Sequence, residues 1–301
     1  MKKIMWTVLL GAVLVLPAAA KPRTMRGSEQ HKTQEVYTVA PFTDLSVSGQ
    51  LEVEFTQGPQ GTYTVQYAGP YNLVQRINVQ SQDGVLSVSY TEPLQILGDE
   101  HVLVKVAAPD LRRIEIKNSG EVHAHEALSV DSLSVWADGK AEIELDKVSA
   151  RSVSADLRGD AEVEFLSLTC ELLQVKATHT ATFDSLRTDC DTVISQGYNR
   201  SEIILSGLNS GQVSAENFDS SEMEIKGKTN SVSLAAHGRS QIDAGGLQAE
   251  DADVTVEKTG HVNVRASGTL NAQTEGRGTV EYKGWPQQIN QTGKGTVKRD
   301  K

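Results

Sequence analysis

The chain has 301 residues, with 29 Lys and Arg against 39 Asp and Glu, and a formal net charge of −10 at pH 7. An acidic chain repels nucleic acid and anionic lipid surfaces, so this charge argues against nucleic-acid binding. Aromatic residues make up only 5% of the chain, and Val, Ile and Leu alternate with small polar residues. This composition favours stacked β-strands over a thick conventional core.

The first 20 residues have the pattern of a secretory signal peptide. Lys2 and Lys3 precede an apolar run from Ile4 to Leu16, and a Pro-Ala-Ala-Ala sequence ending at Ala20 offers a small-residue cleavage site. The apolar run is short for a membrane span, and no later segment is apolar enough to cross a bilayer. We therefore expect export to the periplasm, the cell surface or the medium, with no transmembrane span.

Two segments precede the regular part of the chain. Residues 21–34 are polar, basic and without periodicity, which predicts a flexible leader. Residues 35–111 alternate as β-strands do but do not yet repeat, and we expect a β-rich cap and the first rungs there. Such a cap is needed because an open β edge recruits other chains.

Hairpin signals within residues 35–111 define the expected cap. Alternating runs over 51–55 and 63–67, on either side of a Gly/Pro loop, predict one hairpin. Asp83-Gly84 between two further alternating runs predicts a second. A last strand over 102–106 is closed by Pro109.

A repeat of ~20 residues runs from Asn118 to the C-terminus, and a fixed period of this length is typical of solenoids. Three columns define it. Nearly all members of the first tolerate a left-handed backbone: Asn118, Gly139, Gly159, His179, Asn199, Asp219, Gly238, Lys258, Gly276 and Gly293. The second, two positions later, holds small residues: Gly120, Ala141, Ala161, Ala181, Ser201, Ser221, Ser240, Gly260, Gly278 and Gly295. The third, two positions further on, is apolar: Val122, Ile143, Val163, Phe183, Ile203, Met223, Ile242, Val262, Val280 and Val297.

Each repeat carries two alternating strands, such as 133–137 and 141–145, whose apolar side chains would point into the coil. The leucine and asparagine pattern of leucine-rich repeats and the period of a helical repeat are both missing. We therefore predict an all-β fold: a single-stranded right-handed parallel β-helix with ~20-residue rungs and an N-terminal β-hairpin cap. Residues 112–301 would form the regular rungs, and Trp285-Pro286 would seal the C-terminal end.

The two cysteines, Cys170 and Cys190, lie one repeat apart. Equivalent positions on adjacent rungs stack ~4.8 Å apart, which is within the Cα range of a disulfide. Export would permit oxidation, but neighbouring in-register residues do not always orient their Cβ atoms suitably. A disulfide and a pair of stacked thiols both remain open.

Two segments resemble a known family. The run from Phe42 to Gly58 looks like the opening of the putative auto-transporter adhesin head GIN domain family, and the runs from Gly276 to Pro286 and from Gly293 to Val297 look like its end. The resemblance covers roughly residues 36 to 297 and treats residues 35–301 as one β-helix domain. It implies an exported bacterial β-helical protein and supplies no catalytic residues.

Two outward columns are acidic and suggest a calcium ladder, since Ca²⁺ takes six to eight oxygen ligands. One holds Glu121, Glu142, Glu162, Glu202 and Glu222, and the other holds Glu144, Glu164, Asp184, Glu224 and Asp243. The alternative is a solvated face that resists aggregation, because like charges one strand apart are tolerable in water. The absence of a calcium-binding Gly-Gly-x-Gly-x-Asp repeat favours this alternative.

A second metal hypothesis rests on the run His123, His125 and Glu126. Alternation places both histidines on one face, and Glu144 and Asp146 should lie beside them one rung later. Two imidazoles and a carboxylate suit Zn²⁺. Two exposed histidines on a polar sheet are the more frequent explanation of such a pair, and no cofactor is required by the sequence.

The remaining motifs favour binding over catalysis. Arg158-Gly159-Asp160 is a cell-adhesion tripeptide at a predicted rung corner, although the turn already accounts for its glycine. No Gly-x-Ser-x-Gly is present, and the cysteines lack a clear histidine partner. The outward bases Lys140, Arg158, Lys176 and Arg200 are scattered rather than clustered.

The sequence therefore predicts a non-enzymatic cell-envelope or secreted scaffold, adhesin-like, that presents its strand faces to an envelope protein or a glycan. The alternative is a polysaccharide lyase or hydrolase that uses paired outward carboxylates.

Overall fold

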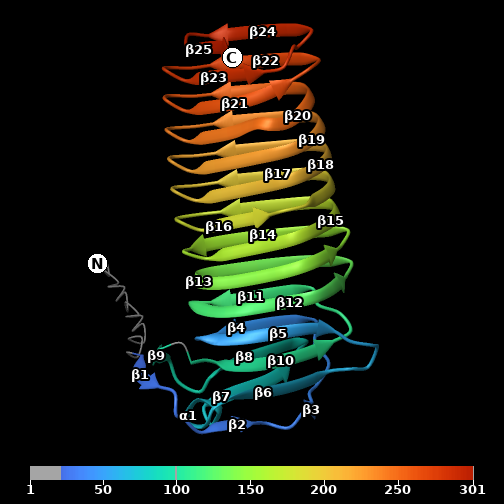
Figure 1. The fold of residues 1–301 in the computed structure, drawn as a ribbon, viewed down its shortest axis with the longest axis vertical. Coiled ribbons are helices and arrows are strands. Elements are labelled where there is room, and N and C mark those ends of the chain that lie inside the picture. The colour runs from blue at the N-terminus through green and yellow to red at the C-terminus, as the bar shows by residue number, and fades with distance from the viewer. Residues whose placement is uncertain (1–21, 99, 301) are drawn as a thin grey trace, which may run out of the picture.

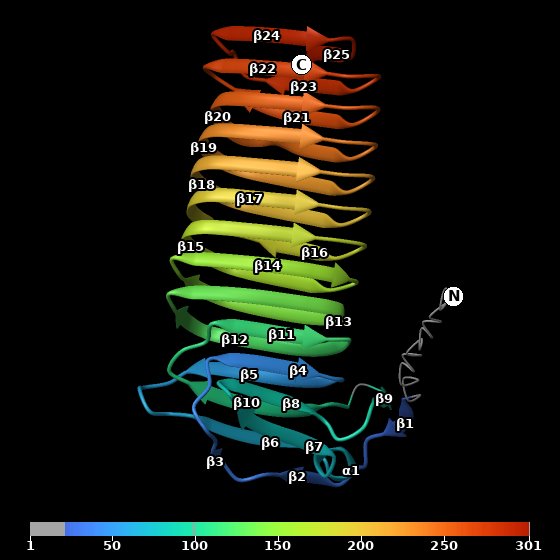
Figure 2. The same cartoon turned by 180° about the vertical axis from the view of Figure 1, so that it is seen from behind.

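The computed structural model describes residues 22–98 and 100–300. The predicted signal peptide, residues 1–20, lies outside the described residues. The protein is an all-β solenoid of about 9 turns, in which each rung stacks on the previous one by parallel strand pairing (Figures 1 and 2). No helix of the described residues is long and apolar enough to cross a membrane.

The regular rungs form one continuous ladder with two broad outer faces. Its strands are β11 (Arg113–Lys117), β12 (Ser119–Ser129), β13 (Ser132–Ser149), β14 (Ser152–Gly159), β15 (Glu162–Ala177), β16 (Thr182–Ser185), β17 (Thr188–Gly197), β18 (Glu202–Asn217), β19 (Glu222–Ala236), β20 (Gln241–Val256), β21 (His261–Ala266), β22 (Thr269–Thr274), β23 (Thr279–Lys283), β24 (Gln288–Gly293) and β25 (Thr296–Arg299). Longer strands such as β13 pass from one face to the other around a corner. The chain therefore alternates between the two faces along its whole length.

The two faces are named here by what they carry. The carboxylate face is the outer surface of β12, the end of β13, the starts of β15, β18, β19 and β20, and strands β16, β21, β23 and β25. The tryptophan face, which carries Trp136, is the outer surface of β11, the start of β13, β14, the ends of β15, β17, β18, β19 and β20, and strands β22 and β24.

The predicted column of residues with a left-handed backbone is confirmed. These residues lie at the edge where each rung turns from the tryptophan face to the carboxylate face, which is called the turn edge. All ten members of the column have a positive φ, from 56° at Lys258 to 95° at Gly293. Glycine is required where rungs approach most closely, since a Cβ on Gly139 would lie 2.3 Å from the carbonyl oxygen of Asn118. One recurring backbone conformation thus sets the period of the whole solenoid.

The two other predicted columns form the core. Every member of the small column from Gly120 to Gly278 is buried, and so is every member of the apolar column from Val122 to Val280. Phe165 and Phe183 are among the largest fully buried side chains, and their rings lie 5.7 Å apart on adjacent rungs. Because a single rung cannot bury these side chains, stacking supplies the hydrophobic stabilisation.

The N-terminal cap closes one end of the solenoid with antiparallel pairing. Its elements are β2 (His31–Thr33), β3 (Tyr37–Thr38), β4 (Asp44–Ser48), β5 (Leu51–Gln57), β6 (Thr64–Pro70), α1 (Tyr71–Val74), β7 (Ile77–Gln82), β8 (Val85–Tyr90) and β10 (Val102–Ala108). Strand β8 pairs parallel with β4 and antiparallel with β7, which confirms the hairpin at Asp83-Gly84. Leu73 and Val74 of α1 are buried against this end.

The other predicted hairpin is wrong. Strands β5 and β6 do not pair with each other, because β10 lies between them, parallel to β5 and antiparallel to β6. Val102, Val104 and Val106 of β10 are buried in the core. Strand β10, which is distant in the sequence, therefore pairs with both β5 and β6. Its valines add to the buried core, which favours this arrangement over direct pairing of β5 with β6.

The segment predicted as a leader contains backbone pairing in its described part, residues 22–34. Two short strands form there: β1 (Arg23–Arg26), which pairs with β9 (Leu94–Leu97), and β2, which pairs with the outer edge of β6. Their side chains are mostly exposed, so no hydrophobic alternation marks them in the sequence. Backbone hydrogen bonding to an available edge is enough to order them.

Trp285 does not seal the C-terminal end as predicted. Its side chain is 79% exposed, and its indole is covered on one side by the guanidinium of Arg299, 3.3 Å from the ring centroid.

Candidate functional site

Two outward columns run side by side along the tryptophan face. The first consists of Arg113, Ser134, Ser154, Gln174 and Ile194, one from each successive rung. The second consists of Glu115, Trp136, Asp156, Lys176 and Gln196, in the same register. Parallel in-register pairing thus gathers side chains that are 20 or more residues apart in the sequence.

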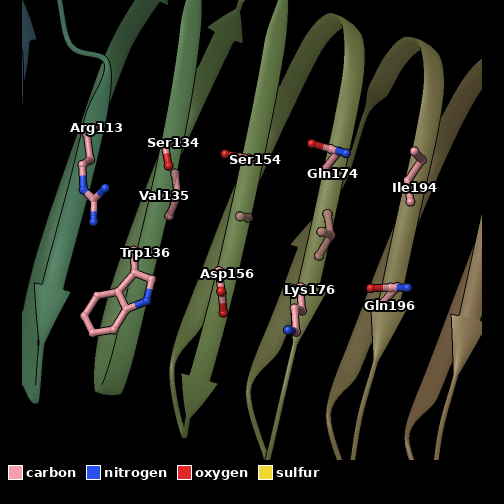
Figure 3. A pocket seen from close by; sticks show the side chains of 12 residues that line it. Arg113, Ser134, Val135, Trp136, Ser154, Asp156, Gln174, Lys176, Ile194 and Gln196 are labelled. Carbon is pink, nitrogen blue, oxygen red and sulfur yellow. The ribbon is translucent and has the colours of Figure 1, made fainter.

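A depression of about 330 Å³ lies over these columns. Figure 3 shows the indole of Trp136 lying broadside on this face, with Asp156, Lys176 and Gln196 following it along the same column. The depression exists because Ser134 and Ser154 are short, whereas the side chains around them are long. Its lining combines one aromatic surface with hydroxyl and amide groups, as ligand sites do.

The carboxylates near Trp136 are already paired with cations. Glu115 lies between Lys117 (Nζ–Oε1 2.5 Å) and Arg113 (Nη2–Oε2 3.1 Å). The hydrogen bond from Lys117 is the main reason that the pKa of Glu115 is lowered from its ordinary value. Asp156 accepts two hydrogen bonds from Arg158, from Nε and Nη2, each 3.1 Å long. The lowered pKa of Glu115 does not favour the protonated form that a general acid needs.

The indole of Trp136 is flanked by cations above and below in the stack. Lys117 Nζ and Arg158 Cζ each lie 6.0 Å from the ring centroid. Contacts at this distance orient the ring weakly. Both cations are also engaged with carboxylates, and the indole is partly exposed to solvent.

A second depression, of about 480 Å³, adjoins the first at the turn edge. Its lining residues are Arg158, Lys176, Thr178, His179, Tyr198 and Asn199. Lys176 lines both depressions, and its Nζ lies 5.7 Å from the ring centroid of Tyr198. Tyr198 begins a stack of rings with Phe218 and His237, at centroid distances of 4.7 Å each. The stack makes this part of the edge rigid.

The residues of the zinc hypothesis meet in pairs rather than at one point. His123 Nδ1 lies 3.1 Å from Glu144, and His123 Nε2 lies 3.7 Å from Glu121. His125 Nδ1 lies 3.6 Å from Asp146. The predicted proximity across one rung is therefore found, but no three His, Cys, Asp or Glu side chains among the described residues form a metal-binding group.

The carboxylate face holds unpaired acids. Glu142, Glu164 and Asp184 each have a raised pKa, first because burial disfavours the ionised form and then because neighbouring carboxylates repel it. For Glu142 those neighbours include Glu121 and Glu144. Such a face is electrostatically costly, and none of its described side chains form a group of three that could hold a metal ion.

Cys170 and Cys190 form a disulfide between β15 and β17 in the structure, with their Cα atoms 4.6 Å apart. The bond joins two adjacent rungs at the corner opposite the turn edge, and Cys190 is only 1% exposed. It ties the middle of the solenoid together covalently.

The Arg158-Gly159-Asp160 tripeptide does lie at a rung corner, where Gly159 has a φ of 73°. However, Arg158 is bound to Asp156, and Thr180 donates a hydrogen bond to Asp160. Both charged ends of the motif are thus engaged within the protein.

Sequence reasoning missed the depression on the tryptophan face. It treated Arg158 and Lys176 as scattered bases, whereas the structure brings them to one place on adjacent rungs. The signal was present in the spacing of Trp136, Asp156, Lys176 and Gln196, which share one column.

Comparison with known families gives a match over most of the chain. The family model described as putative auto-transporter adhesin, head GIN domain, matches residues 41–197 and 182–286. No curated protein matches the chain.

Solved structures show the same fold. A putative adhesin from Parabacteroides distasonis ATCC 8503 is 18% identical, covers 92% of this chain and 100% of its own, and has a TM-score of 0.51. A putative adhesin from Parabacteroides merdae ATCC 43184 is 18% identical, covers 93% of this chain and 100% of its own, and has a TM-score of 0.51. A putative lipid binding protein from Parabacteroides distasonis ATCC 8503 is 16% identical, covers 93% and 100%, and has a TM-score of 0.49. At these identities the likeness to the two putative adhesins is one of fold alone.

Proposed function

Since this chain belongs to the putative auto-transporter adhesin head GIN domain family, we propose that it is a non-enzymatic binding protein of the cell envelope or the medium, and that it binds a glycan on its tryptophan face. The observation that carries this proposal is the partly exposed indole of Trp136 beside a depression lined by hydroxyl and amide groups. The family description supports a binding role, and the side chains of the tryptophan face indicate that the ligand is a glycan.

The chemistry of the depression suits a sugar. The apolar C–H face of a pyranose packs on an aromatic ring, and Trp136 presents such a ring. Ser154 and Gln174 beside it can both donate and accept hydrogen bonds, as sugar hydroxyls do. An oligosaccharide could extend along these two columns and contact several successive rungs. A small ligand would contact only one or two of them.

Catalysis is less well supported than binding. A glycosidase needs one carboxylic acid with a raised pKa next to a second carboxylate. On the tryptophan face, Glu115 and Asp156 are ion-paired instead. The acids with raised pKa values, Glu142, Glu164 and Asp184, belong to the carboxylate face and do not line the depression beside Trp136.

An extracytoplasmic location fits both the family and the disulfide. Disulfides persist in oxidising compartments such as the periplasm or the cell exterior. The Cys170–Cys190 bond would be reduced in the cytoplasm.

A glycan array tests the proposal, with release of reducing sugar assayed on every glycan that the exported protein binds. We expect binding without release, lost in Trp136→Ala and kept in Trp285→Ala. Trp285 is the control, because it is a surface tryptophan that also lies beside a cation, Arg299, but it lines a separate depression of about 540 Å³. Binding to no glycan, or equal loss in both variants, would refute the assignment to the tryptophan face. Sugar release would establish the hydrolase or lyase alternative.

A further inference from the structure

We infer that the glycan bound on the tryptophan face is acidic, and that its carboxylate or sulfate group is held at Lys176, where the two depressions meet. This inference rests on the proposed function, because it assumes a sugar ring on Trp136. Beyond the proposed function, it states that the glycan is negatively charged and that its anionic group lies at Lys176.

The first argument is that Lys176 has no anionic partner. Its neighbour in the column on one side is Asp156, whose carboxylate is taken up by two hydrogen bonds from Arg158. Its neighbour on the other side is Gln196, whose amide donates to Glu216. Among residues 22–98 and 100–300, no carboxylate lies within 4.0 Å of the Lys176 ammonium. An exposed ammonium facing a hollow is complementary to an anion.

The second argument is the local balance of charge. The two depressions are lined by three cationic side chains, Arg113, Arg158 and Lys176, and by one anionic side chain, Asp156. Arg113 is paired with Glu115 and Arg158 with Asp156, so the charge of Lys176 is left unbalanced. The chain as a whole has a formal charge of −10. The depressions therefore carry positive charge in a protein whose overall charge is negative. This local charge attracts anions to the tryptophan face rather than to the carboxylate face.

The third argument is the shape of the shared hollow. Lys176 lines both depressions, of about 330 Å³ and about 480 Å³, and the second adds His179 and Asn199 as further polar groups. Trp136 and Lys176 stand two rungs apart in one column, which corresponds to roughly 10 Å. The ring on the indole and the anionic group at Lys176 must therefore belong to different sugar units. The minimal ligand is an oligosaccharide.

The experiment compares uronate-containing oligosaccharides with their carboxyl-reduced neutral forms by calorimetry at low salt. We expect the wild type to bind the acidic form about tenfold more tightly, the effect of one charge-assisted hydrogen bond. Lys176→Gln should remove that preference, so that the variant binds the acidic and neutral forms with equal affinity. Trp136→Ala should weaken both forms. Arg239→Gln, which changes an exposed cation outside both depressions, should bind like the wild type.

Each contrary outcome overturns a different statement. Equal affinity of the wild type for the two forms refutes the inference and leaves the proposed function standing. No binding of either form refutes the proposed function as well. A loss in Arg239→Gln equal to that in Lys176→Gln shows diffuse attraction and removes Lys176 as the anion site. The protein could instead bind phosphatidylglycerol vesicles through Lys176 and bind no acidic oligosaccharide. That result would assign the anion to a lipid and refute the acidic glycan.

Discussion

The carboxylate face and the tryptophan face are built on the same rungs and the same inward columns, yet they carry opposite chemistry. On the carboxylate face, acids stand beside acids, and the pKa values of Glu142, Glu164 and Asp184 are raised. On the tryptophan face, Glu115 and Asp156 are paired with cations, and Lys176 is left without a carboxylate in the described chain. The inward residues therefore fix the fold, and the outward residues can be chosen for function.

The largest effect should come from breaking the inward column itself. Ala161→Arg places a charge where the side chain is 1% exposed, with no room and no partner, and we expect a loss of stability above about 4 kcal/mol. Glu162→Arg, one residue later on the outer surface, should change stability by less than about 0.5 kcal/mol. Thermal unfolding followed by circular dichroism measures both. Equal melting temperatures would contradict the assignment of inward and outward columns.

The disulfide should have the next largest effect, since it joins two rungs at the corner between the faces. Its sequence separation is 20 residues, and removing a cross-link over a loop of this size should cost about 3 kcal/mol. Urea unfolding of the Cys170→Ala/Cys190→Ala protein measures the loss. A reductant should destabilise the wild type and leave the variant unchanged, whereas two titratable thiols in the denatured, unreduced wild type would show that the bond is absent.

The pH dependence of stability should distinguish the two faces. A carboxyl group whose pKa is raised in the folded state destabilises the fold when ionised, so stability rises as the pH falls through its folded pKa toward the ordinary value. Glu142, Glu164 and Asp184 are of this kind. Glu115 is the opposite, because its pKa is lowered and the stability it contributes is lost as the pH falls below the ordinary value of 4.5.

Two variants separate these contributions by urea unfolding between pH 7 and pH 4. The triple variant Glu142→Gln/Glu164→Gln/Asp184→Asn should be more stable than the wild type at pH 7 by a few tenths of a kcal/mol per site, because these groups are partly exposed. That advantage should shrink as the pH falls and the wild-type acids become protonated. Glu115→Gln should be less stable than the wild type at pH 7. A triple variant that is less stable at pH 7 would contradict the repulsion inferred for the carboxylate face.

What could be predicted from the sequence follows the same division between inward and outward positions. The inward columns and the turn column were readable because each repeats one physical requirement, such as the positive φ at Asn118 and Gly139. The cap was only half readable, because β10 reaches its partners β5 and β6 from a distance in the chain and no local signal specifies that pairing. The spacing of the two cysteines predicts that they lie on adjacent rungs, but it does not predict whether they form a disulfide. That depends on the orientation of the two Cβ atoms, which is set by the backbone conformation at the corner of the rung.

The binding surface was hidden for a different reason. Outward residues need not repeat, so Trp136, Asp156, Lys176 and Gln196 look unrelated until the register places them in one column. A period of ~20 residues applied to every position, not only to the apolar ones, would have shown it. The acidic columns are evident in the sequence because they do repeat.

The smallest effect should be that of zinc on the carboxylate face, where sequence reasoning pointed to His123, His125, Glu144 and Asp146. Each histidine lies beside a carboxylate, but the contacts are separate pairs, 3.1 Å at His123–Glu144 and 3.6 Å at His125–Asp146. A structural zinc site needs four ligands around one point. We therefore expect equal melting temperatures with and without zinc, in the wild type and in His123→Ala alike. A zinc-dependent rise in the wild type that His123→Ala abolishes would show that the pairs rearrange into a site, and the carboxylate face would then carry a function of its own.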